Sequence, residues 1–591
     1  MTKTYITSWN LSPLFKSDND PNIAKIRKEV IRETNRFVKK WGKRTDYLEK
    51  PKILKEALDE YEKWLRFYGP LFQENYYFDL RHAVNQSDPK IKAKVNLAEE
   101  VALKLQNEIQ FFELRVAKID SKLQNKFLSY KPLSPYKHFL EKLFEAQKHL
   151  LTEPEEKIMN LKSTTSYTNW VRMTSTFLSK EERGGKNFSE ILGLMNSKNK
   201  KIRDSAAKSF NEILDKHVEV AEHELNSVLQ NKKINDELRK YKRADESRHI
   251  GDDVDTEVVD TVVKTVTQQF DVSKRYYELK AKLFGVPKLA YHERNVEYGK
   301  IDKKYPYEKS IEVITQTLTN LDTEFFDIFN GFLNEGRVDV YPQKGKKSGA
   351  FCIYGLITHP IYILLNYNNL LDDVRTFAHE LGHGINDELM RKAQNSLNFG
   401  TPTSTAEVAS TFFEDFVIKE LSRQVDEEMK LTLMMAKLNQ DISSIFRQIA
   451  FYNFETELHR EFRKIGYLSK DDIGVLFQKH MVSYMGNYVE QSPGSQNWWT
   501  YVEHFRYFFY VYSYASGLLI SKSLQASVKT DPKFIGKVKD FLSAGSSDSP
   551  KNIFAKLGID ITDRSFWEKG ISEIENLLSE TEKLARKLRN I

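Results

Sequence analysis

Apolar residues recur at helical spacing through most of this chain of 591 residues. Hydrophobic side chains three or four positions apart, separated by charged ones, are typical of amphipathic helices. This pattern predicts helices over 23–41, 51–68, 89–118, 135–150, 205–229 and 255–283. Several of these segments start at proline, which is favoured in the first turn of a helix. The chain should therefore fold as a mainly α-helical protein.

The pattern changes after Arg337, where short β-rich runs replace the helical spacing. The runs contain Val338 and Val340, then residues 351–353, then residues 361–365. They predict a small sheet directly before the next helix. An exposed strand in this sheet could pair with an extended peptide through main-chain hydrogen bonds. The alternative is an ordinary covered sheet.

A helix should follow the sheet, because apolar residues again lie on one side at a period of 3.6: Val374, Phe377, Ala378, Leu381 and Ile385. On this helix, His379 and His383 are four residues apart and project from the same face. Two imidazoles placed in this way can bind one Zn²⁺ and leave coordination positions open. Glu380 could take a proton from a water molecule at such a site. Taken alone, these residues could instead form an ordinary solvated helix face.

Two glutamates further along the chain change this picture. Glu407 precedes a segment of helical spacing and could supply a third metal ligand, while the alternative is a capping box with Ser404. Glu414 lies two turns beyond Glu407 on the same face, where a carboxylate could brace a histidine ligand. The sequence therefore predicts a zinc hydrolase site with one Zn²⁺ per chain, held by His379, His383 and Glu407.

Composition narrows the function classes. The net charge of +7 is small for this length, and basic and acidic residues are interspersed, which argues against a nucleic-acid-binding surface. The single cysteine, Cys352, excludes internal disulfides and suits a reducing compartment. The first ten residues lack the apolar core of a signal peptide, and no apolar run of membrane-spanning length occurs. We therefore expect a cytoplasmic protein that binds neither nucleic acid nor membranes.

The chain resembles the oligoendopeptidase F branch of the thimet oligopeptidase family of zinc peptidases. The segments that carry the resemblance are Val340-Tyr341-Pro342, 344–350, His359-Pro360, 364–367, 379–383, 406–411, His504-Phe505 and 509–515. The likeness is strongest between about residues 200 and 580. Asn386 departs from the family, since many relatives have a histidine there, but that position is not a ligand in the family.

The resemblance implies a fold and a substrate class. It suggests a two-lobed helical peptidase with a deep substrate channel and a small β-sheet beside the zinc-binding helix. Residues 1–200 would form an N-terminal helical domain that makes one channel wall, and residues 201–591 would form the catalytic domain. An enclosed channel implies that the enzyme hydrolyses internal bonds of short unstructured peptides. Neither the resemblance nor the sequence distinguishes a monomer from a homo-oligomer.

The resemblance also assigns roles to an aromatic segment near the C-terminus. A run of tyrosines alone is more typical of a core, but phenol and imidazole donors can stabilise an oxyanion. The resemblance places His504, Tyr510 and Tyr514 near positions where the family uses a histidine and tyrosines to stabilise the tetrahedral intermediate. We expect these residues on a helical segment, with His504 and Tyr510 catalytic and Tyr507 and Tyr514 near the substrate, although spacing alone leaves open which tyrosine contacts the oxyanion. His359 could contact substrate, as the resemblance suggests, or cap a turn.

Two alternative functions fit part of the pattern. A metal-dependent carboxypeptidase on a similar fold would need a positive group for the terminal carboxylate. A catalytically silent peptide-binding protein would not need Glu380 together with three metal ligands, and their joint presence argues against it.

Overall fold

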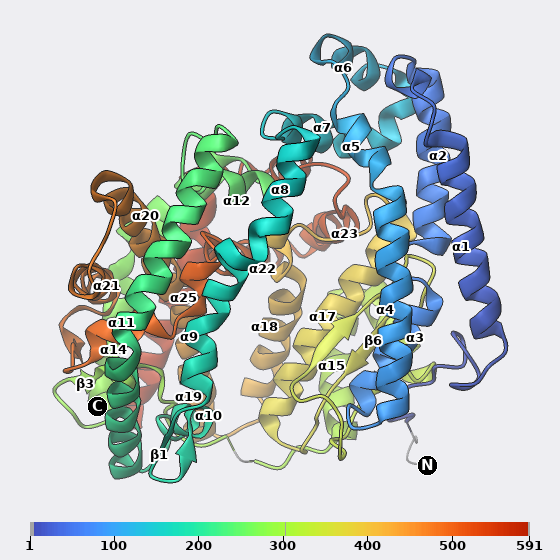
Figure 1. Ribbon diagram of the computed structural model, residues 1–591. Coiled ribbons are helices and arrows are strands. Elements are labelled where there is room, and N and C mark those ends of the chain that lie inside the picture. Colours follow the sequence, from blue (N-terminus) through green and yellow to red (C-terminus); the bar gives the residue numbers. More distant parts are fainter. Residues whose placement is uncertain (1–4, 302, 589–590) are drawn as a thin grey trace.

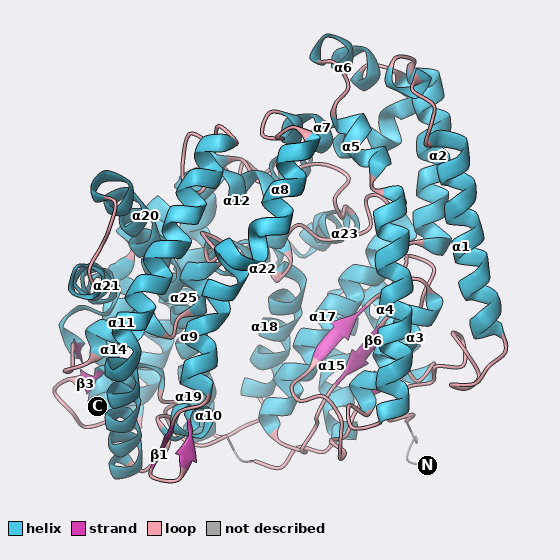
Figure 2. Ribbon diagram, viewed as in Figure 1, coloured by secondary structure: helices cyan, strands magenta, loops and turns pink. Residues whose placement is uncertain are grey.

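The computed structural model describes residues 5–301, 303–588 and 591. Helices dominate this part of the chain and the sheets are small, which confirms the predicted mainly α-helical fold (Figure 2). In Figure 1, the N-terminal helices and the helices α9 (Asn169–Ser179) and α11 (Lys200–Leu238) lie on opposite sides of α17 (Leu371–Ala393) and α18 (Val408–Ser422). This arrangement matches the two lobes that the family resemblance implies.

The α-helices of the N-terminal lobe are α1 (Asn22–Trp41), α2 (Pro51–Tyr68), α3 (Gln73–Val84), α4 (Pro89–Ile109), α5 (Phe111–Ala117), α6 (Ser121–Leu128) and α7 (Lys137–Gln147). The first two coincide with their predicted segments to within one residue. The predicted helix over 89–118 is instead two helices, which meet at Gln110. Asp88 caps the first of these, since its carboxylate accepts the backbone N–H of Lys90 at 2.8 Å.

The helices on the other side continue the chain as α8 (Glu153–Ser163), α9, α10 (Phe188–Leu194), α11, α12 (Glu246–Gly251), α13 (Thr256–Gln268) and α14 (Phe270–Leu283). A π-helical turn, Thr164–Thr168, joins α8 to α9. The strands β1 (Glu182–Arg183) and β2 (Lys186–Asn187) form a hairpin before α10. Gly184 and Gly185 make its turn at φ of 59° and 71°, a conformation that favours glycine.

The predicted sheet is present and lies against α17. Its strands are β4 (Val338–Asp339), β5 (Phe351–Ile353) and β6 (Tyr362–Leu364), in the order β4-β6-β5. β6 is parallel to β4 and antiparallel to β5, with Cys352 opposite Ile363. β5 is therefore an edge strand with one unpaired side. Elsewhere, β3 (Leu289–Ala290) pairs in parallel with β7 (Val489–Glu490).

The remaining helices are α15 (Tyr307–Leu321), α16 (Thr323–Asn334), α19 (Glu427–Asp441), α20 (Arg447–Ile465), α21 (Lys470–Met485), α22 (Tyr512–Thr530), α23 (Ile535–Ser543), α24 (Pro550–Lys556) and α25 (Arg564–Lys587). Of these, α15, α16, α19, α22 and α23 pack against α17 or α18. A second π-helical turn, Ile442–Phe446, precedes α20. All five residues of the predicted apolar stripe on α17 are buried. Because this face of α17 is buried, the other face, which carries His379 and His383, is the one that can contact a ligand.

Gly382 allows α17 and α18 to approach to backbone contact. A Cβ atom at this position would lie 2.6 Å from the Cα atom of Ser410 and 2.8 Å from the carbonyl oxygen of Ala409. Both neighbours are backbone atoms and cannot rotate away. Residue 382, directly before the second histidine of the motif, must therefore be glycine for the helices to pack at this distance.

Separate apolar cores underlie the two lobes. One core lies among α1, α2, α4, α5 and α7, and a larger one extends from Leu178 to Ala585. The hydroxyl of Tyr76 on α3 joins the N-terminal lobe to the sheet, because it donates to the carbonyl oxygens of Ile353 at 3.0 Å and Pro360 at 2.9 Å. The division into residues 1–200 and 201–591 stays a prediction, although Phe188 on α10 already packs in the larger core.

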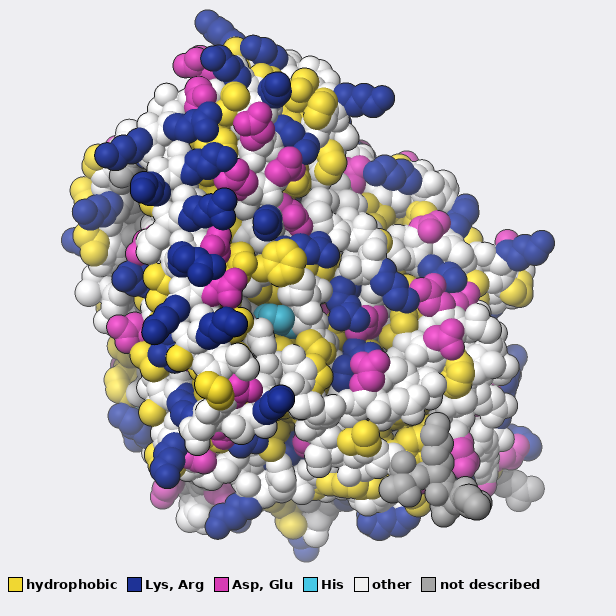
Figure 3. All heavy atoms as spheres, turned by 90° about the vertical axis from the view of Figure 1, so that its right-hand side faces the viewer, with side chains coloured by type: hydrophobic (Ala, Val, Ile, Leu, Met, Phe, Trp, Pro, Cys, Tyr) yellow, Lys and Arg dark blue, Asp and Glu magenta, His cyan; other side chains and the backbone are white. Residues whose placement is uncertain are grey.

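The surface carries mixed charge. On the face shown in Figure 3, Lys and Arg side chains are interspersed with Asp and Glu side chains, as the sequence indicated. Among the helices that the structure describes, none has both the length and the apolar character needed to cross a bilayer.

Candidate active site

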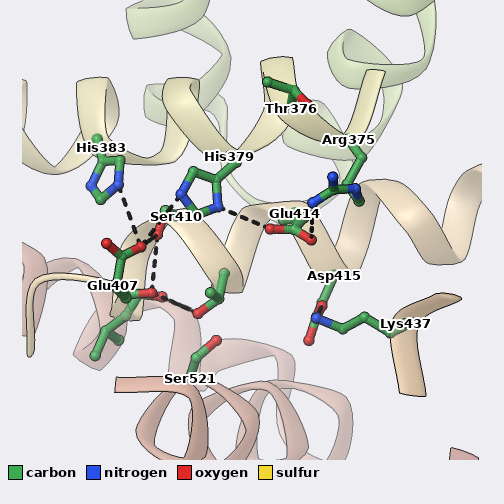
Figure 4. Close-up of polar contacts among 12 residues, drawn as sticks. Arg375, Thr376, His379, His383, Glu407, Ser410, Glu414, Asp415, Lys437 and Ser521 are labelled. Carbon is green, nitrogen blue, oxygen red and sulfur yellow. Dashed lines mark hydrogen bonds and ion pairs between the residues drawn. The ribbon is translucent and has the colours of Figure 1, made fainter. Parts of the chain in front are cut away.

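Two histidines and a glutamate converge between α17 and α18. His379 and His383 project from α17, and Glu407 is the residue before the first turn of α18 (Figure 4). An oxygen of the Glu407 carboxylate lies 3.4 Å from Nε2 of His379 and 3.5 Å from Nε2 of His383. The residues of the predicted ligand set are thus brought together from α17 and from the position directly before α18.

The spacing of these three groups fits a tetrahedral metal ion. Zn²⁺ binds nitrogen and oxygen ligands at about 2.1 Å, which places the ligands about 3.4 Å from one another in a tetrahedron. The separations between Glu407 and the two imidazoles match this value. Their side chains are 25% to 37% exposed, so the site is open to a small ligand on one side.

Electrostatics also favours a cation among these groups. Although burial opposes it, hydrogen bonding to Glu407 and Glu414 raises the pKa of His379 to about 10. The pKa of Glu407 is strongly lowered against the effect of burial, because both histidines contact its carboxylate. The carboxylates therefore favour a positive charge at this position, which a bound metal ion could supply while the imidazoles stay neutral.

Glu407 does not act as a helix cap. Its side chain makes no capping hydrogen bond, and its carboxylate instead accepts the hydroxyl of Ser410 at 2.7 Å. The capping box with Ser404 that the sequence left open is therefore absent. Ser410 was not singled out by the sequence analysis, but its place one turn after Glu407 is a signal that could have found it.

Glu414 orients His379 from behind. One of its carboxylate oxygens lies 2.9 Å from Nδ1 of His379, so the opposite ring nitrogen faces Glu407. Glu414 is fully buried, and its other oxygen lies 3.5 Å from the Arg375 guanidinium. A buried carboxylate at Nδ1 fixes both the tautomer and the ring orientation that a metal ligand needs. Arg375, one turn before His379, was also missed in the sequence.

Glu380 faces the sheet on the same helix. Burial raises the pKa of its carboxyl group, opposed by the two histidines and by a hydrogen bond to the backbone of Cys352 in β5. The side chain is only 8% exposed. A carboxylate held between the histidine pair and an edge strand can exchange a proton with a group bound at either side.

His504, Tyr510 and Tyr514 form an aromatic cluster. Nδ1 of His504 is hydrogen-bonded to the hydroxyl of Tyr510, and the two tyrosine rings lie 5.8 Å apart. Burial and the nearby Arg447 lower the pKa of His504 to about 4, so its imidazole is neutral at physiological pH.

The helix that follows connects this cluster to Glu407, one of the predicted metal ligands. The hydroxyl of Ser516 on α22 donates to the carbonyl oxygen of Ser404 at 2.9 Å. A Cβ atom at Gly517 would lie 3.3 Å from Cβ of Glu407. The first turns of α22, which include Tyr514, therefore pack beside Glu407.

The aromatic segment is not the continuous helix that the sequence suggested. A short 3-10 turn, Glu503–Arg506, ends before two residues with left-handed backbone, Phe508 and Phe509, and α22 starts only at Tyr512. Tyr507 lies outside the cluster and its side chain is 45% exposed. Phe508 and Phe509 must therefore turn the backbone so that the Tyr510 hydroxyl can bond to His504.

His359 lies in a turn beneath the sheet. It is 7% exposed, its Nδ1 accepts the backbone N–H of Leu356 at 3.2 Å, and its ring stacks on Tyr76 at 5.4 Å between ring centres. Burial lowers its pKa to about 4. This geometry corresponds to the turn-capping alternative, and contact with substrate stays a prediction.

Comparison with known families gives two matches along the chain. A model of peptidase family M3 matches residues 193–573, and a model described as oligopeptidase F matches residues 116–180. The first covers more than half of the chain. It includes α17, Glu407 and the aromatic cluster.

Curated relatives match over nearly the whole length. An oligoendopeptidase F homolog of Lactococcus lactis subsp. lactis is 24% identical over 98% of this chain and 97% of its own length. The oligopeptidase PepF of Bacillus subtilis is 25% identical over 98% of this chain and 88% of its own.

Solved structures share the fold. A protein from Chlamydophila abortus, described as a peptidase, matches with a TM-score of 0.87 and 22% identity, covering 98% of each chain. The oligoendopeptidase-F of Enterococcus faecium matches with a TM-score of 0.68 and 19% identity, over 96% of this chain and 99% of its own.

Proposed function

The chain belongs to peptidase family M3. We propose that it is a zinc-dependent endopeptidase that cleaves internal bonds of short unstructured peptides. As a member of this family, it is a metallopeptidase that acts on oligopeptides. The observation that carries the proposal is the convergence of His379, His383 and Glu407, with Glu380 beside them.

The proposed cofactor is one Zn²⁺ per chain. Two imidazole nitrogens and one carboxylate oxygen are the ligand set of a catalytic zinc site, which keeps a further position for water or substrate. When bound, the ion would polarise the scissile carbonyl group and lower the pKa of a water molecule.

Glu380 is the proposed general base and acid. Its carboxylate can accept a proton from the attacking water and later give that proton to the leaving nitrogen. Burial raises its pKa, which suits a group that must both take and return a proton.

The aromatic cluster is the proposed oxyanion site. Since His504 is neutral, its Nδ1–H can donate to the oxygen of Tyr510, which leaves the phenol proton free for a developing oxyanion. Tyr514 lies beside both groups and is proposed to contact substrate, as is the exposed Tyr507.

The edge strand β5 is the proposed docking place for the peptide backbone. Among the strands that the structure describes, none pairs with its outer side, and the backbone of its central residue, Cys352, acts on the Glu380 carboxyl group. A substrate paired with β5 would lie close to Glu380. Main-chain pairing gives affinity without demanding particular side chains.

Mass spectrometry of products from a mixed peptide library, with Zn²⁺ present, tests the proposed function. Cleavage within peptides blocked at both ends is expected. Removal of single C-terminal residues from free peptides only would indicate a carboxypeptidase. Binding without cleavage would indicate a catalytically silent protein.

Tyr510→Phe should lower kcat by about 10²–10³-fold with little change in KM, because a donor to the oxyanion acts only as charge develops. The ring and its packing remain. Steady-state kinetics on a defined peptide measure both constants.

Tyr512→Phe is the matched control. Its hydroxyl donates to the buried Asp252 at 2.9 Å, so its loss should cost about 1–3 kcal/mol of stability and leave kcat near wild type. Melting curves report this change. Equal, small kinetic effects of both substitutions would remove Tyr510 from the proposed oxyanion site.

Glu414→Gln should weaken metal binding by about 10–100-fold, because Nδ1 of His379 loses its charged acceptor. Titration with Zn²⁺ against a competing chelator measures the affinity. Glu420→Gln on the same helix, where Glu420 pairs with Arg423 near the surface, is the control and should bind metal normally. Unchanged affinity in Glu414→Gln would contradict a bracing role.

A further inference from the structure

The segment that carries the aromatic cluster contains an unusual turn. Phe508 and Phe509 have φ of 54° and 57°, in the left-handed region that side chains other than glycine rarely adopt. Among the described residues they are the only adjacent non-glycine pair with positive φ. Such a conformation persists only where surrounding contacts impose it, and it occurs preferentially at functional sites.

Arg248 holds one side of this turn. It lies on α12, and its guanidinium donates from Nε to the carbonyl oxygen of Phe508 at 3.0 Å and from a terminal nitrogen to that of Tyr507 at 2.7 Å. The planar fork of an arginine binds two successive carbonyl groups through separate nitrogen atoms in a fixed geometry, which the ammonium group of a lysine does not provide. The guanidinium also lies 5.8 Å from the centre of the Tyr510 ring.

Glu455 holds the other side. Its carboxyl group, on α20, accepts the backbone N–H of Phe509 at 2.8 Å. The side chain is fully buried, and its second oxygen has no hydrogen-bond partner among the residues that the structure describes. Burying a carboxyl group with one unsatisfied oxygen is unfavourable for stability. A role in fixing the turn explains why this position is not apolar.

A third side chain holds the backbone just before the turn. Tyr167 lies in the π-helical turn between α8 and α9, and its hydroxyl donates to the carbonyl oxygen of Arg506 at 2.5 Å. Its ring also packs 6.0 Å from that of Phe508. π-Helical turns are frequent at functional sites. Consecutive peptide groups before Tyr510 are thus held by side chains from three separate helical segments.

The turn reverses the chain between His504 and α22, and so brings the Tyr510 hydroxyl to the imidazole. We propose that Glu455 and Arg248 are positioning residues for peptide hydrolysis, which hold the Phe508–Phe509 turn and through it the Tyr510 hydroxyl. This inference rests on the proposed role of Tyr510. Neither residue touches the substrate in this scheme.

The first test compares two substitutions at Glu455. Glu455→Gln keeps an oxygen that can accept the Phe509 N–H, so kcat should stay close to wild type. Glu455→Met has a similar size but no such acceptor, and kcat should fall about 100-fold, the scale for a misplaced catalytic group, while KM and zinc content change little. Similar kcat values for both variants and wild type would overturn the proposal, as would a loss seen only in melting temperature.

A double-mutant cycle with Tyr510→Phe separates this proposal from the proposed function. If Glu455 acts through the Tyr510 hydroxyl, Glu455→Met should have little further effect on kcat once that hydroxyl is gone. Fully additive losses would reject the positioning role while leaving the oxyanion role of Tyr510 intact. Normal kcat in Tyr510→Phe alone would reject both.

Arg248 gives an independent variant should Glu455→Met fail to fold. Arg248 is part-exposed at 31%, so its replacement disturbs the core less. Arg248→Lys keeps the charge but loses the fork, and kcat should fall about 10-fold or more with KM little changed. An unaltered kcat in folded Arg248→Lys, judged by its melting curve, would remove Arg248 from the scheme.

Discussion

Replacement of Glu380 by glutamine should remove nearly all peptidase activity and leave the metal in place. Glutamine preserves the size of the side chain but cannot accept a proton from water, so kcat should fall by roughly 10²–10⁴-fold. The ligands His379, His383 and Glu407 are untouched, so zinc content and peptide binding should be normal. Metal analysis, binding titration and single-turnover kinetics measure these quantities.

Glu380→Asp is the informative companion. It keeps a carboxylate but withdraws it by one methylene group towards α17, so its activity should lie between wild type and Glu380→Gln. Such an order would link activity to both the presence and the position of the carboxylate. Near-normal turnover in Glu380→Gln would assign the base to another residue.

His383→Ala should lose metal and activity together. Only one imidazole and one carboxylate would remain of the three groups that converge at the site, and two ligands do not hold a zinc ion in competition with water. Elemental analysis should find about one zinc per chain in the wild type and little in the variant. The loss of activity should therefore match the loss of bound metal.

Removal of the metal from the wild-type protein with a chelator tests the same dependence reversibly. Wild-type protein stripped of metal should be inactive and recover when Zn²⁺ is added, whereas His383→Ala should not recover. His480→Ala, which removes a histidine on α21 bonded to Glu457, is the control and should retain its metal. Full activity of thoroughly stripped wild-type protein would contradict a metal-dependent reaction.

The convergence of the proposed metal ligands could be predicted because it depends largely on local geometry. The four-residue spacing of His379 and His383 fixes their common direction on any helix, and the apolar stripe on α17 fixes which side is free. The spacing of Glu407 and Glu414 places both carboxylates on one side of α18. Both carboxylates contact His379 because α17 packs against α18. The spacing of the two glutamates suggested this contact, but only the tertiary structure produces it.

The aromatic segment could not be predicted in the same way. Phe508 and Phe509 would not be assigned left-handed backbone from their own preferences. Their conformation is imposed by Arg248 and Glu455, which are distant in sequence. The spacing of Tyr510 and Tyr514 suggested a helix, and only the later residue belongs to one. The break at Gln110 in the predicted 89–118 helix could not be predicted either, because no glycine or proline lies near it in the sequence.

The backbone contact at Gly382 bears on which ions the protein can accept. At Gly382, α17 and α18 touch through main-chain atoms. The distance between the two helix backbones is therefore fixed there and cannot be changed by rotating side chains. The three groups at this site offer two imidazole nitrogens and one carboxylate. Calcium takes six to eight oxygen ligands and is therefore poorly served by this set. Small transition metals that accept imidazole would compete with one another there.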